Sequence, residues 1–305
     1  MNIRSSETFA RIETIELCKS HSGHVLTIIQ GCVDGVLLVR TNFSHGKTRV
    51  IVIFLWNPTL RKVVDIPFYE SLKKPGCDVL LGFGFDSVSN NYKVVALNFN
   101  DLKTTVYNFG SRSWSSPKQQ RGLIDNNVKF LSISRSLNFE GCVYRLAKGK
   151  LIWGENNATH YLCFNLSTEA LTCSKLPDIK RDDALMMFSR APNCKALRRL
   201  SVLYDSLALV DYCGDSPFRH ILWIRRNDST TSSGFAWVQL YNLDFNFKSI
   251  LYLTNNGNLY LESWSGNPKT ISVYNLKAGE EKVCSTTSEH INFMDGYLGS
   301  LVLYS

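Results

Sequence analysis

Residues 55–68 read LWNPTLRKVVDIPF, and versions of this stretch return along the chain. An apolar run ends in an aromatic residue, an asparagine opens a polar turn, and a second apolar run ends at a proline. Asparagine tolerates turn conformations and can hydrogen-bond to backbone two residues on, whereas proline cannot donate to a sheet ladder. The stretch therefore predicts a β-hairpin whose outer strand stops near Pro67, and a repeat of it would decide the fold.

The repeat is marked by an aromatic residue just before a polar turn, at intervals of about 50 to 60 residues. These aromatic residues are Trp56, Tyr107, Phe164, Trp223 and Tyr274. Interleaved with them are short strand-forming runs at 34–39, 91–97, 140–147, 204–212, 256–263 and 298–305. Each period thus predicts about four strands, which is typical of one blade of a β-propeller. In the fourth unit, IRRNDSTTSSG after Trp223 predicts a long, flexible hairpin tip.

The pattern predicts an all-β chain: a kelch-like β-propeller of about five to six blades, closed by the C-terminal strand at 298–305. Unrelated hairpins in a β-sandwich are the alternative. Helical periodicity is weak throughout, and residues 4–18 and 180–199 are its only candidates. Trp56 is expected to pack between neighbouring blades, with Asn57 and Pro58 setting the turn after it.

The composition is that of a globular intracellular chain. The 305 residues are 44% hydrophobic and 20% charged, with no apolar stretch of membrane-spanning length and no apolar core of a signal peptide at the start. Nine cysteines without a Cys-x-x-Cys pair indicate reduced thiols, so we expect a cytoplasmic or nuclear location. The net charge of +8 comes from dispersed basic pairs, which argues against a nucleic-acid partner.

The sequence names no catalytic, cofactor-binding or metal-binding residue, and we expect no enzyme activity and no cofactor. His21 and His24 form a His-x-x-His pair without a third ligand nearby, whereas a catalytic zinc site needs three. GFGFDS at 82–87 lacks the lysine and the following helix of a phosphate-binding loop. Its glycines either let aromatic strands approach closely or form a bulge. A site assembled from distant blades stays possible.

Several motifs in order resemble the plant F-box-associated domain. They are GCVDGVLLV (31–39), LWNPTLRKVVDIP (55–67), LLGFGFDSVSNNYKVVAL (80–97), VYNFGSRSWSS (106–116) and the closing INFMDGYLGSLVLYS (291–305). The string over 82–95, at its distance from Trp56, is the most specific of these. The resemblance covers roughly residues 30–305, which we assign to the propeller. Two departures are Arg145, where the family has tryptophan, and the tail, which lacks an acidic residue.

In this family an N-terminal F-box docks the Skp-type adaptor of a cullin ubiquitin ligase. Residues 1–29 contain no such string and form an N-terminal segment without a recognised F-box. Two explanations remain open: the F-box was lost, or the sequence is an incomplete gene model. A Skp-type adaptor is therefore a partner only if an F-box lies upstream of this chain.

The resemblance implies a substrate-recognition module, similar to the target-binding half of an SCF-type ubiquitin ligase subunit. The target protein is unknown and no partner-binding residue is named, but five irregular loops are the expected contacts: 42–49, 68–78, 117–128, 178–199 and 226–236. One alternative is a small-ligand or glycan-binding propeller, or a cryptic enzyme, with polar and aromatic groups converging on a central channel. Another is a non-functional or dominant-negative F-box protein fragment.

Overall fold

The computed structural model describes residues 2–4, 11–14, 24–45, 48–67, 79–98, 101–120, 128–130, 136–149, 159–177, 198–212, 219–231, 234–245, 248–263, 266 and 268–287. The chain divides into two compact units. The N-unit contains Cys18–Trp153, Ala158–Lys175 and Tyr297–Ser305, and the C-unit contains Met1–Leu17, Gly154–Asn157 and Leu176–Gly296. In the described ranges both units consist of antiparallel strands and turns, without a helix, which confirms the all-β prediction.

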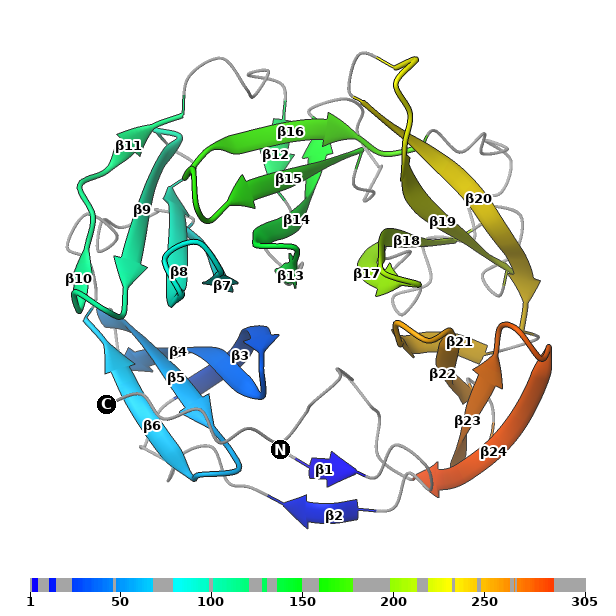
Figure 1. Ribbon diagram of the computed structural model, residues 1–305. Helices are drawn as coiled ribbons and strands as arrows, with labels where there is room; N and C mark the ends of the chain where they lie inside the picture. Colours follow the sequence, from blue (N-terminus) through cyan, green and yellow to red (C-terminus); the bar gives the residue numbers. More distant parts are fainter. Residues whose placement is uncertain are drawn as a thin grey trace. The chain divides into compact units, whose positions relative to one another are not determined.

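Three sheets form the N-unit (Figure 1). The first is β3 (His24–Val33), β4 (Val36–His45), β5 (Thr48–Asn57) and β6 (Lys62–Ile66). The second is β7 (Val79–Asp86), β8 (Asn91–Asn98), β9 (Lys103–Asn108) and β10 (Ser113–Trp114), with β11 (Lys118–Gln119) also on β9. The third is β12 (Val128–Phe130), β14 (Cys142–Gly149), β15 (His160–Asn165) and β16 (Leu171–Lys175), with β13 (Leu137–Phe139) also on β14.

The C-unit has two four-stranded sheets and one strand pair. The first sheet is β17 (Arg199–Leu203), β18 (Ser206–Tyr212), β19 (Arg219–Asn227) and β20 (Phe235–Asp244). The second is β21 (Lys248–Leu253), β22 (Asn258–Ser263), β23 (Lys269–Asn275) and β24 (Glu280–Thr287). The strand pair is β1 (Asn2–Arg4) with β2 (Arg11–Thr14), so residues 11–14 are extended and the helix considered for 4–18 is wrong there.

The predicted repeat is confirmed strand by strand. The five repeating aromatic residues all lie on the third strand of a sheet, namely β5, β9, β15, β19 and β23. Five of the six short runs lie on the second strands, β4, β8, β14, β18 and β22. Up-and-down sheets of this size are the unit of a propeller blade. The sixth run, 298–305, and residues 180–197 lie outside the described residues, so closure by the C-terminal strand stays a prediction.

The asparagine turns form as the sequence predicts. Side-chain Oδ1 atoms accept backbone N–H groups two or three residues on, over 2.8–3.1 Å: Asn57 from Leu60, Asn108 from Gly110, Asn165 from Thr168 and Asn275 from Ala278. Each turn then ends in a residue with positive φ, as at Arg61 (51°) and Gly279 (69°). A left-handed residue at the end of the loop is common in short hairpins.

Two glycines of the most specific motif set the distance between neighbouring sheets of the N-unit. A Cβ atom on Gly82 would lie 2.5 Å from Cγ1 of Val143, and one on Gly84 would lie 2.4 Å from Cδ1 of Leu166. The pairing of β7 with β8 runs without a register shift, so the motif contains no bulge. Of the two roles considered for these glycines, close approach is the one that the structure supports, because a side chain there would overlap the third sheet.

We expect Gly82→Ala to lower the free energy of unfolding by about 1–3 kcal/mol, because the added methyl overpacks a buried contact. Val143→Ala removes the atom that the methyl would meet. The double variant should therefore lose less stability than the sum of the two single losses in urea unfolding. Val88→Ala, in an 81% exposed position of the following turn, is the control with little effect. Strict additivity of the two single changes would contradict this packing.

A buried ion pair joins the second and third sheets of the N-unit. Lys93 Nζ lies 2.8 Å from Asp86 Oδ2 and also donates to the backbone oxygen of Leu166 at 2.8 Å. Ser89 Oγ donates to the same carboxylate at 2.6 Å, and Ser167 Oγ donates to it from the third sheet. Burial alone would raise the pKa of Asp86, but these hydrogen bonds, that from Lys93 above all, hold it well below its usual range.

Arg145, the departure from the family tryptophan, is buried and connects three strands. Its Nη1 donates to the backbone oxygen of Leu81 at 2.6 Å, and its Nη2 lies 3.4 Å from Oε1 of Gln30. Burial and the neighbouring charge of Arg40 lower the pKa of Arg145 to about 9, so the guanidinium stays charged at neutral pH. Arg145 therefore ties β14 to β7 and β3 through charge-assisted hydrogen bonds.

Candidate functional site

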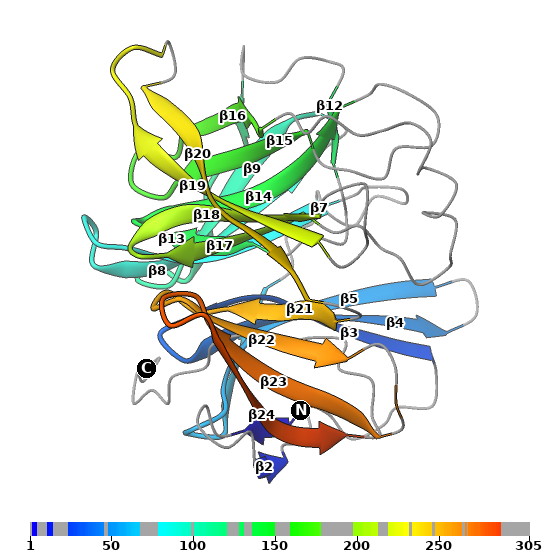
Figure 2. The same cartoon turned by 90° about the vertical axis from the view of Figure 1, so that its right-hand side faces the viewer.

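The β19–β20 hairpin extends beyond the rest of its sheet in the C-unit (Figure 2). β18 pairs with β19 only as far as Ile224, opposite Ala208. From there Arg225–Asn227 pair with Phe235–Trp237 of β20 alone. We call residues 225–237 the arm. A two-stranded segment buries little apolar surface by itself, and Arg226, Asn227 and Phe235 of the arm are exposed.

The tip of the arm is held by its own backbone. The N–H of Asp228 donates to the oxygen of Gly234 at 2.9 Å, and the N–H of Gly234 donates to Thr231 at 3.0 Å. Gly234 has φ +71°, a conformation that favours glycine. The Asp228 carboxylate accepts the side-chain and backbone donors of Thr230 at 2.6 and 2.9 Å, and these bonds lower its pKa. The long tip that the sequence predicts is confirmed, and its flexibility stays a prediction.

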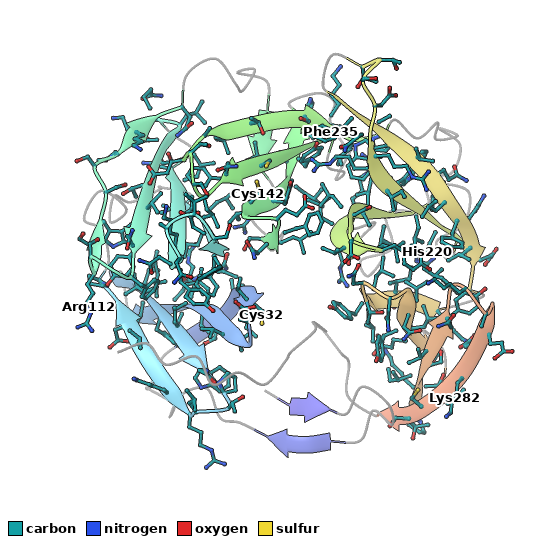
Figure 3. The ribbon with its side chains drawn as sticks, viewed as in Figure 1. Cys32, Arg112, Cys142, His220, Phe235 and Lys282 are labelled. Carbon is teal, nitrogen blue, oxygen red and sulfur yellow. The ribbon has the colours of Figure 1, made fainter. Side chains whose placement is uncertain are left out.

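The arm presents an arginine and apolar surface together. Phe235, labelled in Figure 3, is 40% exposed, and Cζ of Arg225 lies 4.3 Å from the centre of its ring, a cation–π contact. Arg226 is exposed on the other face, opposite Ala236. Just beyond the arm, Val238 is 37% exposed. Phe235 and Val238 are two of the five exposed large apolar side chains among the described residues, and they lie on opposite faces of β20.

The C-terminal half of β20 fixes the arm to the C-unit core. Leu240, Tyr241 and Leu243 pack against a cluster of buried residues that includes Leu222 and Phe245. The register with β19 shifts between Leu222 and Trp223, so β20 has a bulge at Leu240. The strand thus consists of a half-buried anchor from the bulge onward and a more exposed, regularly paired part before it.

A cavity of about 330 Å³ lies where β20 passes into the second sheet of the C-unit. It is lined by Asn242, Leu243, Asp244, Phe245, Lys248, Tyr274 and Glu281. Lys248 forms an ion pair with Glu281; burial would raise the pKa of Glu281, but this pair outweighs it and lowers the pKa. The rings of Phe245 and Tyr274 meet edge to face, with their centres 5.2 Å apart. The lining can accept a polar side chain or a small polar molecule.

Of the five predicted contact loops, 226–236 is described almost completely and forms the tip and sides of the arm. Loop 42–49 is the end of the β4–β5 hairpin, described at 42–45 and 48–49. Loops 117–128 and 178–199 are described only at 117–120, 128 and 198–199, and loop 68–78 lies outside the described residues.

The reactive side chains considered from the sequence do not assemble in the part of the chain that the structure describes. No group of three or more His, Cys, Asp or Glu side chains there could hold a metal ion. His24 begins β3, whereas His21 lies outside the described residues. A hydrogen bond with Cys142, together with burial, raises the pKa of Cys163, which keeps this thiol protonated and a weak nucleophile. The search of the described residues for a membrane-spanning helix found none.

The sequence predicts residues 226–236 as a contact loop, but it predicts neither the uncharged outer strand β20 nor the cavity. The available signal was the run FAWVQLYNL at 235–243, which is uncharged over nine residues and follows a long polar turn. The cavity had no such signal, because its lining comes from four strands and from the turn between β20 and β21.

Comparison with protein families identifies a match over nearly the whole chain. The model of a family described as the F-box associated beta propeller domain matches residues 1–294. An Arabidopsis thaliana protein that carries the name "Putative F-box protein" is 30% identical over 152 residues, which is 48% of this chain and 38% of that protein. The chain thus matches well under half of that relative's length.

Similar solved structures are more distant. An acylaminoacyl peptidase from Pyrococcus horikoshii has a TM-score of 0.46 at 10% identity, over 85% of this chain and 39% of its own. An oligogalacturonate lyase from Vibrio parahaemolyticus has a TM-score of 0.41 at 10% identity, over 86% of this chain and 77% of its own.

Proposed function

This chain belongs to the F-box associated beta propeller family, and on that premise we propose that it is a protein-interaction module that recognises a target polypeptide. In an F-box protein this role corresponds to the target-binding half of an SCF-type ubiquitin ligase subunit. The observation that carries the proposal is the arm, an extended hairpin on which Arg226 and Phe235 are exposed and Arg225 lies against the Phe235 ring. Arginine and aromatic residues are enriched in protein interfaces.

The buried ionisable groups form ion pairs and hydrogen bonds within the fold, and this supports a binding role rather than a catalytic one. Lys93 and Asp86 join two sheets of the N-unit. Arg198 pairs with Asp211 at 2.9 Å in the C-unit and donates to the backbone oxygen of Pro177. These groups are engaged in structural contacts, whereas a catalytic group needs access to a substrate.

Recovery of a partner from plant tissue tests the proposed function. Tagged residues 1–305 are compared with a variant in which 228–234 is replaced by a short Gly-rich turn. Each recovered protein is then purified and its binding to the chain is measured directly. The proposal expects at least one recovered protein to bind with a micromolar or lower Kd. It fails if the folded chain binds none of the proteins recovered with it.

Adaptor docking is a separate part of the proposal, because an F-box supplies it and none is recognised in residues 1–29. We expect purified residues 1–305 not to retain a Skp-type adaptor in a pull-down, whereas a fusion carrying an F-box should retain it. Stable recovery of the adaptor with residues 1–305 would contradict this. A fluorescent fusion tests the proposed cytoplasmic or nuclear location.

We also propose that the five sheets are kelch-like blades closed by the C-terminal strand. Truncation after residue 297 would then remove the pairing of the run 298–305 and expose a sheet edge. A lowered thermal midpoint of the truncated protein is the expected result. An unchanged midpoint would contradict closure by this strand.

The cavity beside β20 favours small-ligand binding as a second candidate function, because its aromatic and charged lining suits a polar molecule such as a sugar. A glycan array probed with the wild type and with Lys248→Ala tests it. A signal that depends on Lys248 would support this candidate, and the absence of any signal would count against it.

A further inference from the structure

The outer strand β20 has an unusual edge. It pairs with β19, and the strand order of its sheet ends there among the described residues. It is ten residues long, and its first nine residues carry no charge and no proline. The edge of an outer strand presents backbone N–H and C=O groups that can pair with another chain. Natural proteins usually protect such edges against pairing with another chain, so an outer strand without this protection indicates a binding role.

The outer strands of the other sheets show this protection. β6 carries Lys62 and Asp65 within five residues, β10 has two residues, β16 has five and ends at Lys175, and β24 begins with Glu280, Glu281 and Lys282. Charge and shortness are the usual means of preventing edge pairing. In β20 the bulge at Leu240 interrupts the edge, but Phe235–Gln239 before it stay regular and uncharged.

The charges around this edge indicate what it would accept. Cross-strand pairing places Arg225 on the face of Trp237 and Arg226 on the face of Ala236 and Val238, so each face carries one arginine. The acidic residue of the arm, Asp228, accepts hydrogen bonds from Thr230 within its own turn. A long arginine can reach across the small Ala236 towards a strand added outside β20. The edge therefore complements a segment with acidic side chains.

We propose that Phe235–Gln239 accepts an added β-strand from the target: an extended segment whose acidic side chains meet the exposed Arg226 on one face while its apolar side chains cover Phe235 on the other face. Main-chain hydrogen bonds supply the affinity, and Arg226 supplies the preference for acidic residues. This deepens the proposed function and rests on it, because it states how the same surface would bind a polypeptide.

The test uses residues 1–305 and two labelled peptides of about nine residues. One alternates valine with glutamate and the other alternates valine with lysine. Fluorescence anisotropy should show that the glutamate peptide binds at least about tenfold more tightly than the lysine peptide. Hydrogen exchange should show slower exchange of the amides of 235–239 in the complex. Equal binding of both peptides, binding of neither at millimolar concentration, or unchanged exchange would each overturn the proposal.

Val238→Glu places a negative charge on the face of Arg226, where the glutamates of the peptide would lie, and should weaken binding of the glutamate peptide by about tenfold or more. Val283→Glu is the matched control, because Val283 is a 60% exposed valine on the outer strand β24. It should change binding by less than about twofold. Both valines are exposed, so both variants should fold, which circular dichroism checks. Equal effects of the two variants would overturn the assignment to β20.

The two proposals can fail separately. If the tissue experiment yields a partner whose binding Val238→Glu leaves unchanged, the chain recognises a protein but not through this edge. If the glutamate peptide binds at β20 while no recovered protein binds the chain, the strand-accepting edge stands and the proposed target recognition fails.

Discussion

Trp56→Ala is expected to lower the free energy of unfolding by about 3–5 kcal/mol, as for other buried large aromatic residues. Trp56 is 4% exposed on β5, between Leu37 on β4 and Val63 on β6. Alanine would leave a cavity in a position held on both sides by paired strands, which cannot collapse freely. Urea unfolding followed by circular dichroism measures the loss.

Val63→Ala is the matched control, because Val63 faces Trp56 across the strand pair but is 52% exposed. Its effect should stay within about 0.5 kcal/mol. The role assigned to Trp56 is structural, so binding of a target should fall only with stability. A well-folded Trp56→Ala protein that had lost its partner alone would refute that role. Packing of Trp56 between neighbouring blades stays a prediction.

Asp86→Ala should destabilise the chain by a similar amount, about 3–5 kcal/mol, because it leaves the Lys93 ammonium buried without its carboxylate. The two side chains are only 2% and 8% exposed. Replacing both, with Asp86→Asn and Lys93→Met, removes the buried charge and should recover part of the loss. Asp101→Ala is the control, since Asp101 and Lys103 form an exposed pair at 3.5 Å. Equal stability of Asp86→Ala and the wild type would contradict the buried pair.

The pH dependence of this contribution has a definite sign. The pKa of Asp86 is lower in the folded chain than in the unfolded one, so the folded chain keeps the carboxylate charged to lower pH. The stabilisation is then fully present above the unfolded value of about 4 and is lost as the pH falls below it. The difference in unfolding free energy between the wild type and Asp86→Ala should accordingly shrink below about pH 4. A difference that stays constant down to pH 2 would contradict this linkage.

Features with a local cause could be predicted from the sequence. The asparagine turns after Trp56 and Tyr107 depend on a side chain and on backbone two or three residues away. The repeat of aromatic residues placed the third strand of every sheet. The close approach at Gly82 was one of two roles considered, and the position of Val143 on the next sheet was needed to choose between them.

Features that depend on pairing register could not be predicted. The arm exists because β19 continues past Ile224 while β18 does not, and the end of that pairing is not marked in the sequence. The bulge at Leu240 likewise divides a continuous uncharged run into an anchor and an open edge. Burial of Arg145 also ran against expectation, because an arginine ordinarily lies at the surface.

Side chains that join neighbouring sheets within each unit often donate their hydrogen bonds to backbone oxygens. Lys93 donates to Leu166 and Arg145 to Leu81 in the N-unit, and Ser201 donates to Leu253 in the C-unit. A backbone oxygen is present whatever residue occupies the position, so only the donor side of such a contact constrains the sequence. Blades joined in this way can diverge independently during evolution, and covariation between the donor and acceptor positions should be weak.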